Sequence, residues 1–172
     1  MTRCWDVDIW SFLKVCHYSL HTKLKLYNTC ILPIFLYGSE CWAVTRNDVC
    51  KINALNQWCL RILLGINWQQ HVRNDEVRRL TKQPHLSAIV QSRRMSLFGH
   101  IARMRDETDT KQILTASPAG NWRRPLGRPR ITWMKTIQQD LKSSNLNMDD
   151  AVDLAQNRPL WRLMSTFGAT HC

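Results

Sequence analysis

The chain has 172 residues and a formal net charge of +11, from 24 Lys and Arg against 13 Asp and Glu. Hydrophobic residues make up 44% of it, which excludes a disordered polar tail and is enough for one ordinary domain or two small ones. So large a basic surplus favours a polyanionic partner, either a nucleic acid or an acidic membrane surface.

Features that direct a protein to a membrane or out of the cell are absent from the sequence. Asp6 and Asp8 precede any apolar run near the start, which argues against a signal peptide. The longest apolar run, residues 30–37, contains Pro33 and is far shorter than the roughly 20 residues of a membrane span. The 7 Cys are odd in number and form no C-x-x-C pair. We therefore expect an intracellular protein of the nucleus or cytoplasm, not secreted, with free thiols and no membrane partner.

The apolar spacing predicts helices along the whole chain. It is helical from Leu20 through Leu24 and Tyr27, and Pro33 then implies a kink or a boundary, although a strand remains an alternative around Pro33. Two further helices are predicted, each with an apolar stripe along one face. Asn47 or Asp48 is the candidate N-cap of the first helix, and Pro84 lies just before the second. Their members are Ile52, Leu55, Cys59, Ile62 and Ile66, then Leu86, Ile89, Val90, Leu97, Ile101 and Met104.

The last third of the chain combines a basic loop with shorter helices. Three Pro and two Gly within residues 117–129 predict a linker or an exposed loop. Beyond it, three helices are predicted from the residues Ile131, Met134, Ile137 and Leu141, from Ala151, Leu154 and Ala155, and from Leu160, Leu163, Met164 and Phe167.

Six short blocks resemble the C-terminal part of the reverse transcriptases of LINE-type non-LTR retrotransposons, in the order that this family uses. The blocks are Leu36-Tyr37-Gly38-Ser39-Glu40-Cys41-Trp42, residues 59–68, 72–77 and 93–104, Gly127-Arg128-Pro129-Arg130-Ile131-Thr132-Trp133, and residues 155–162. The resemblance covers residues 17–167, and Asn157 departs from the Asp that the family usually has there.

The resemblance implies an all-α fold that begins where the family's helical thumb follows the polymerase palm. The expected organisation is a poorly matched segment 1–16, a thumb-like helical domain 17–105, a basic linker or loop 106–130 and a C-terminal helical segment 131–172. A thumb of this kind grips the template–primer duplex by its backbone, so the implied partners are RNA or an RNA–DNA hybrid, together with a reverse transcriptase palm domain. The paired palm aspartates and the endonuclease domain of the family are missing, so no enzyme activity is expected.

Two basic blocks supply the candidate nucleic-acid contacts. Residues 71–105 hold eight basic and two acidic side chains, and residues 111–135 hold six basic and no acidic ones. Arginine forks match phosphate oxygens, and the flanking tryptophans are candidates for stacking on unpaired bases, with burial in neighbouring helices as the alternative. The candidate phosphate contacts are Arg93, Arg94, Arg123, Arg124, Arg128, Arg130 and Lys135, and the candidate stacking residues are Trp122 and Trp133.

Catalytic, metal and cofactor sites are not predicted. The cysteines and histidines lack the close pairs of a structural zinc site. The run Asn147-Met148-Asp149-Asp150 resembles a reverse transcriptase catalytic signature, but its flanks are not apolar β-runs, and we interpret the two acids as the first turn of a helix. Two other functions stay open: an unselected transposon relic, and a protein–protein adaptor that uses the orphaned palm-facing surface.

Overall fold

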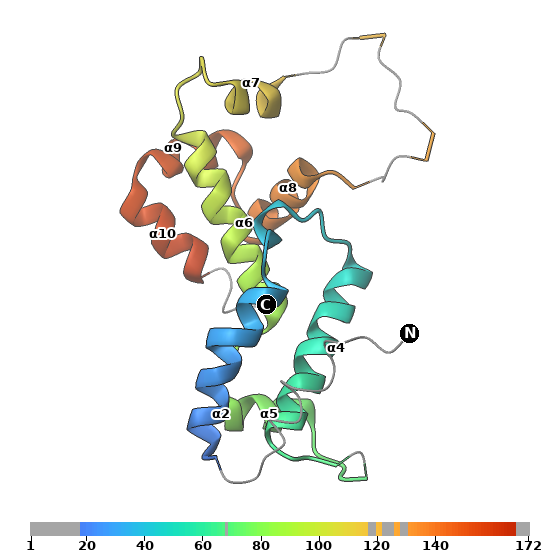
Figure 1. The fold of residues 1–172 in the computed structure, drawn as a ribbon. Helices are drawn as coiled ribbons and strands as arrows, with labels where there is room; N and C mark the ends of the chain where they lie inside the picture. The colour runs from blue at the N-terminus through green and yellow to red at the C-terminus, as the bar shows by residue number, and fades with distance from the viewer. Residues whose placement is uncertain (1–17, 68, 117–119, 122–125, 128–130, 168–172) are drawn as a thin grey trace. The chain divides into compact units, whose positions relative to one another are not determined.

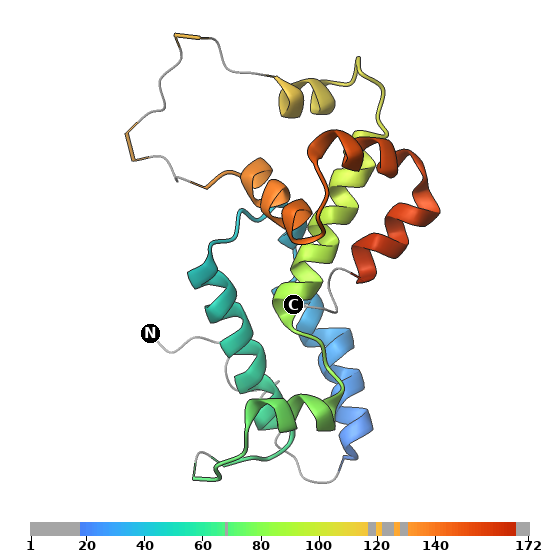
Figure 2. The same ribbon diagram turned by 180° about the vertical axis from the view of Figure 1, so that it is seen from behind.

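The computed structural model describes residues 18–67, 69–116, 120–121, 126–127 and 131–167. Within those ranges the chain forms helices and turns and no strand, so the all-α prediction is confirmed for the described residues (Figures 1 and 2). The strand alternative around Pro33 is therefore wrong.

The chain divides into two compact units, each built from two stretches of sequence. Unit 1 combines residues 1–37 with 50–86, and unit 2 combines residues 38–49 with 87–172. The sequence instead predicts consecutive segments, because composition and loop signals act locally along the chain.

Unit 1 begins with one helical run that changes its winding near Pro33. The run consists of α2 (Leu20–Leu26), a π-helical turn η1 (Tyr27–Ile31) and α3 (Leu32–Phe35). Pro33 stands in the first turn of α3, where its missing N–H costs least, and the wider π turn lies directly before it. The kink or boundary predicted at this proline is confirmed as a change in helix type.

The remaining helices of unit 1 are α5 (Asn74–Thr81) and most of α4 (Arg46–Leu63). The buried apolar core consists of Tyr27, Ile31, Cys59, Leu60, Leu63 and Val77. The Tyr27 hydroxyl donates a 2.7 Å hydrogen bond to Asn56 Oδ1, so the core also contains a satisfied polar pair. Burial raises the pKa of Tyr27 and raises that of the Cys59 thiol to about 12, which keeps both groups neutral.

The predicted face of α4 is only partly correct. The helix buries Asn56, Gln57, Cys59, Leu60 and Leu63, whereas Leu55 is exposed. The apolar stripe misses the true face because that face contains two polar residues. The helix also begins earlier than predicted: Thr45 Oγ1 accepts from the Asp48 backbone N–H, and Asp48 Oδ2 accepts from the Thr45 N–H and hydroxyl, a reciprocal capping arrangement.

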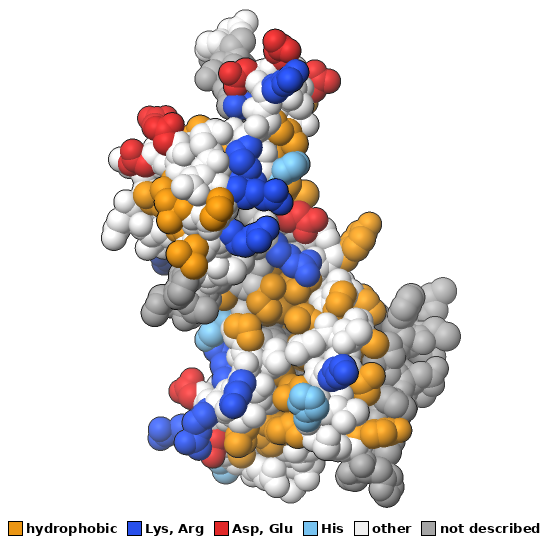
Figure 3. Space-filling model, turned by 90° about the vertical axis from the view of Figure 1, so that its left-hand side faces the viewer, with side chains coloured by type: hydrophobic (Ala, Val, Ile, Leu, Met, Phe, Trp, Pro, Cys, Tyr) orange, Lys and Arg blue, Asp and Glu red, His pale blue; other side chains and the backbone are white. Residues whose placement is uncertain are grey.

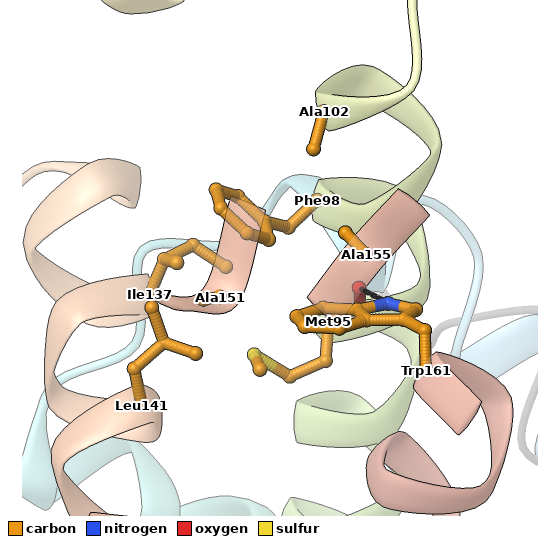
Figure 4. Packing of buried hydrophobic residues seen from close by; sticks show 8 residues of the cluster. All are labelled: Met95, Phe98, Ala102, Ile137, Leu141, Ala151, Ala155 and Trp161. Atoms are coloured by element: carbon orange, nitrogen blue, oxygen red, sulfur yellow. Dashed lines mark hydrogen bonds between the residues drawn. The ribbon is translucent and has the colours of Figure 1, made fainter. Parts of the chain in front are cut away.

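Unit 2 is built around α6 (Leu86–Ala102), which in both ribbon views runs between α8 (Trp133–Ser143) and α10 (Arg158–Phe167). Its other elements are the 3₁₀ turn η2 (Ser39–Cys41), α7 (Asp109–Thr115) and α9 (Met148–Gln156). The core lies between α6, α8, α9 and α10 and consists of Met95, Phe98, Ala102, Ile137, Leu141, Ala151, Ala155 and Trp161 (Figure 4).

The helices predicted after residue 130 are present, with one error of register. Ile137 and Leu141 of α8 and Ala151 and Ala155 of α9 are buried as predicted. In α10 the predicted residues Leu160 and Leu163 are exposed, and Trp161 and Ser165 are buried instead. The helix α7 lies inside the segment 106–130, so those seven residues are not loop as expected.

Asp149 and Asp150 occupy the first turn of α9, as the sequence predicts. Carboxylates are stabilised there by the free backbone N–H groups and the helix dipole. The reverse-transcriptase-like signature at these residues is therefore part of a helix start, and no β-hairpin carries it.

Candidate nucleic-acid interface

Most of the predicted basic loop lies outside the described residues. This holds for Trp122, Arg123, Arg124, Arg128 and Arg130. Their assignment to nucleic-acid contact stays a prediction from sequence. The candidates that the structure describes are Arg93, Arg94, Trp133 and Lys135, all in unit 2.

Arg94 is not placed to contact a phosphate. Its side chain is buried on α6, where Nη2 lies 2.6 Å and Nε 2.7 Å from Asp140 Oδ2 of α8, and Nη1 donates to the Trp42 carbonyl at 3.4 Å. Burial raises the pKa of Asp140, and the neighbouring guanidinium opposes that rise. We therefore correct the assignment of Arg94 from a phosphate contact to one half of a buried ion pair that joins α6 to α8.

Trp133 also has a structural partner. Its indole Nε1 donates a 2.7 Å hydrogen bond to the Glu40 carbonyl, and its ring packs against the core of unit 2. This favours the packing alternative over base stacking for Trp133. Lys135 is exposed in the first turn of α8, where its backbone N–H donates to the Thr132 hydroxyl that caps the helix.

One face of α6 carries a polar and basic stripe. Arg93, Ser96, His100 and Arg103 follow one another at intervals of three, four and three residues, which places them on one side of a helix. Arg93, Ser96 and His100 are exposed, whereas Arg103 is half-buried. The buried side of α6 lies opposite and includes Met95 and Phe98 of the apolar core.

A second stripe lies on α10. Arg158, Trp161, Arg162 and Ser165 share one side of this helix at intervals of three, one and three residues. The two arginines are exposed, whereas Trp161 is 2% exposed and forms a wall between the helices. The Trp161 indole fits against α6 because Gly99 has no side chain. A Cβ atom at position 99 would collide with the indole.

The two stripes line a central pocket and two adjoining hollows. The central pocket has a volume of about 230 Å³ and is lined by Ser96, His100, Arg103, Arg158, Trp161, Arg162 and Ser165. On one side it adjoins a hollow of about 400 Å³ lined by Glu40, Arg93, Ser96, Leu97 and His100. On the other side it adjoins a hollow of about 450 Å³ lined by Arg158, Pro159 and Arg162.

The charge of this surface is strongly positive. Four arginines line the three hollows, against one carboxylate, that of Glu40. Figure 3 shows Lys and Arg side chains in a row that runs down the upper half of its view, with a histidine and an acidic side chain beside them. Among the ion pairs formed within the described ranges, none involves Arg158 or Arg162. A concave surface of this charge attracts anions and releases counterions when a polyanion binds.

Of the residues that line this surface, only Arg93 is among the contacts predicted from the sequence. His100 and Arg103 belong to the same basic helix but are not among those contacts, and neither are Arg158 and Arg162. A signal for the last two was present: they are four residues apart in a predicted helix and so lie on one face. That they lie beside the α6 stripe depends on the packing of Trp161 on Gly99, which spacing alone does not reveal.

Other kinds of site are not found in the described part of the chain. No group of three or more His, Cys, Asp or Glu side chains there is arranged to hold a metal ion. None of the described helices combines the length and the apolar character that crossing a membrane requires.

Comparisons with known proteins do not identify a relative. No protein-family model, no curated protein and no solved structure matches this chain. Its functional interpretation therefore depends on the sequence blocks and on the surface described above.

Proposed function

We propose that this chain is a non-catalytic nucleic-acid-binding segment, derived from a LINE-type reverse transcriptase, that holds the backbone of RNA or an RNA–DNA hybrid. The observation that carries the proposal is the pair of arginine stripes on α6 and α10, which line one basic surface of unit 2. Guanidinium forks bind phosphate oxygens without reading the bases, so little sequence preference is expected.

The proposal also draws on the contacts between the blocks that resemble this family. Trp133 of one block bonds to Glu40 of another, Arg94 bonds to Trp42, and Trp161 bonds to Met95. Four blocks that are far apart in sequence thus contact one another within unit 2. This supports an interpretation in which they specify one folded module corresponding to the thumb and the segment after it.

The test is a titration of a fluorescently labelled RNA–DNA hybrid by anisotropy at several salt concentrations. We expect binding that weakens steeply with salt, since the logarithm of affinity falls by about 0.9 per neutralised phosphate for each decade of salt on duplex DNA. The variant R158A/R162A should weaken binding and reduce the salt slope by one to two phosphate contacts. The control R46A/K51A removes two exposed charges from α4 and should leave the slope nearly unchanged.

A folded chain that binds no nucleic acid would contradict this function. The adaptor alternative is favoured by an apolar cleft of about 490 Å³ in unit 2, lined by Cys41, Leu97, Ile101, Met104, Thr110, Ile113 and Trp133. Binding to a purified palm domain without binding to nucleic acid would single out the adaptor. A chain that melts without cooperativity would instead indicate the transposon relic.

A further inference from the structure

The three hollows of the basic surface share lining residues, and we call them together the trough. Ser96 and His100 line both the central pocket and the hollow beside Arg93. Arg158 and Arg162 line both the central pocket and the hollow at Pro159. A ligand that fills all three hollows must therefore follow one path along the unit, from the Arg93 side of α6 to the start of α10.

The central pocket receives cationic groups from both helices. Arg103 and His100 come from α6, and Arg158 and Arg162 come from α10. Arg103 Nη1 donates a 2.9 Å hydrogen bond to the Ala155 carbonyl, which fixes the guanidinium while leaving most of its five N–H donors for a ligand. Guanidinium groups on both sides of one pocket suit a single compact anion, such as one phosphate group, better than they suit a flat surface.

The described residues of the trough expose no Phe, Tyr or Trp ring as a platform for bases. Among the described residues that line these three hollows, the aromatic rings are those of Trp161 and His100. Trp161 is 2% exposed and donates from Nε1 to the Met95 carbonyl at 2.9 Å. It packs against Phe98 at a ring-centroid distance of 5.7 Å and so is held in the core. Proteins that bind single strands through their bases expose Phe, Tyr or Trp rings for stacking, and the described residues of this surface expose none of these.

Taking the proposed function as its basis, we propose that the trough holds one nucleic-acid strand by its phosphates alone. A phosphate occupies the central pocket between Arg103, Arg158 and Arg162, its neighbours along the strand lie in the two flanking hollows, and the bases point to solvent. The ligand class is thus a single-stranded segment of any sequence, such as the unpaired strand next to a duplex. Glu40 lines the same hollow as Arg93, so its carboxylate weakens the attraction of that hollow for a phosphate, and the central pocket is the strongest phosphate position.

The experiment compares four labelled probes of equal length on the full chain: a thymidine single strand, a single strand made only of abasic sites, a blunt DNA duplex and the RNA–DNA hybrid. We expect the thymidine and abasic strands to bind with dissociation constants within about threefold of each other, because only the backbone is contacted. We expect both to bind at least about tenfold more tightly than the blunt duplex. The variants R162Q and R103Q should each weaken binding of the abasic strand about tenfold or more.

Two controls keep the result interpretable. R79Q removes an exposed arginine of unit 1 and should change single-strand binding less than threefold. Because Arg103 is half-buried and bonds to Ala155, a circular dichroism melt must show that the R103Q variant still folds. The Arg162 side chain is exposed and has no such contact among the described hydrogen bonds, so R162Q tests the proposal without this complication.

Each outcome distinguishes the two proposals. If no probe binds to the folded chain, the nucleic-acid function itself fails. If the hybrid binds but the abasic strand does not, or if R162Q and R79Q weaken the abasic strand equally, the single-strand trough is wrong while the function stands. Tight binding of the thymidine strand with loss of the abasic strand would likewise overturn it, because the bases would then be read.

Discussion

The substitution Gly99→Ala tests how α10 is held against α6. In most exposed helix interiors this change stabilises a protein by up to about 1 kcal/mol, because alanine favours the helix. Here the added methyl group would collide with the Nε1, Cδ1 and Cε2 atoms of Trp161. Helix propensity and packing therefore predict effects of opposite sign on the free energy of unfolding.

The size of the change in the free energy of unfolding depends on the contacts that the Trp161 indole would lose. Trp161 is 2% exposed, contacts Phe98 and donates to the Met95 carbonyl at 2.9 Å, so it cannot shift without losing buried contacts. Overpacking of a core costs about 1–3 kcal/mol, and leaving a buried indole N–H unpaired costs about 1–3 kcal/mol more. After a gain in helix propensity of up to about 1 kcal/mol, we expect Gly99→Ala to destabilise the chain by about 1–5 kcal/mol.

Urea unfolding followed by circular dichroism measures this change, and a double-mutant cycle assigns its cause. In a Trp161→Leu background the methyl group has room, so Gly99→Ala should become neutral or stabilising. If Gly99→Ala stabilises the natural chain, or costs the same with and without the indole, then the close packing of α10 on α6 is refuted.

Two further predictions concern the interiors of the units. Replacing Arg94 with Met leaves Asp140 buried without its partner and should cost about 3–5 kcal/mol in thermal or urea unfolding near neutral pH. Loss of the guanidinium raises the pKa of Asp140 further, so the folded variant binds a proton more readily than the unfolded chain does. The variant's loss in free energy of unfolding, relative to the natural chain, should therefore shrink as the pH falls from 8 to 5. A loss that stays constant over this range would contradict the prediction. Iodoacetamide at pH 8 should alkylate the exposed Cys50 readily and Cys59 only on unfolding. The reason is that the Cys59 thiol is buried and that burial raises its pKa to about 12. Mass spectrometry of tryptic peptides separates the two sites.

The sequence predicts α8 and α9 well because their buried faces are apolar apart from Thr136 and their ends carry strong signals. Ala151 and Ala155 lie on one face, and two acids occupy the first turn of α9. Periodicity fails where the core includes polar atoms. On α4 the buried face contains Asn56, whose partner, the hydroxyl of Tyr27, is 29 residues earlier in the chain. Such a pair is visible only once the two helices are packed together.

In the candidate site, too, the sequence does not reveal which side chains are buried. Arg93 and Arg94 are adjacent in a basic helix, and charge alone gives them the same role, yet one is exposed and the other is buried against Asp140. Which of two neighbours faces solvent depends on the direction from which α8 packs. The contribution of α10 to the trough depends on the absence of a side chain at Gly99. No local sequence pattern reveals either the direction of helix packing or the close approach of two helices at a glycine.

The interleaved order of the two units has a consequence for dissecting the protein. Residues 38–49 of unit 2 lie in sequence between the two stretches of unit 1. No single cut of the chain therefore releases either unit whole: a fragment starting at residue 38 lacks Tyr27 and Ile31, and so leaves Cys59, Leu60 and Val77 without the helix that covers them. To isolate unit 2, an engineer would have to bridge residue 49 to residue 87 with a designed linker.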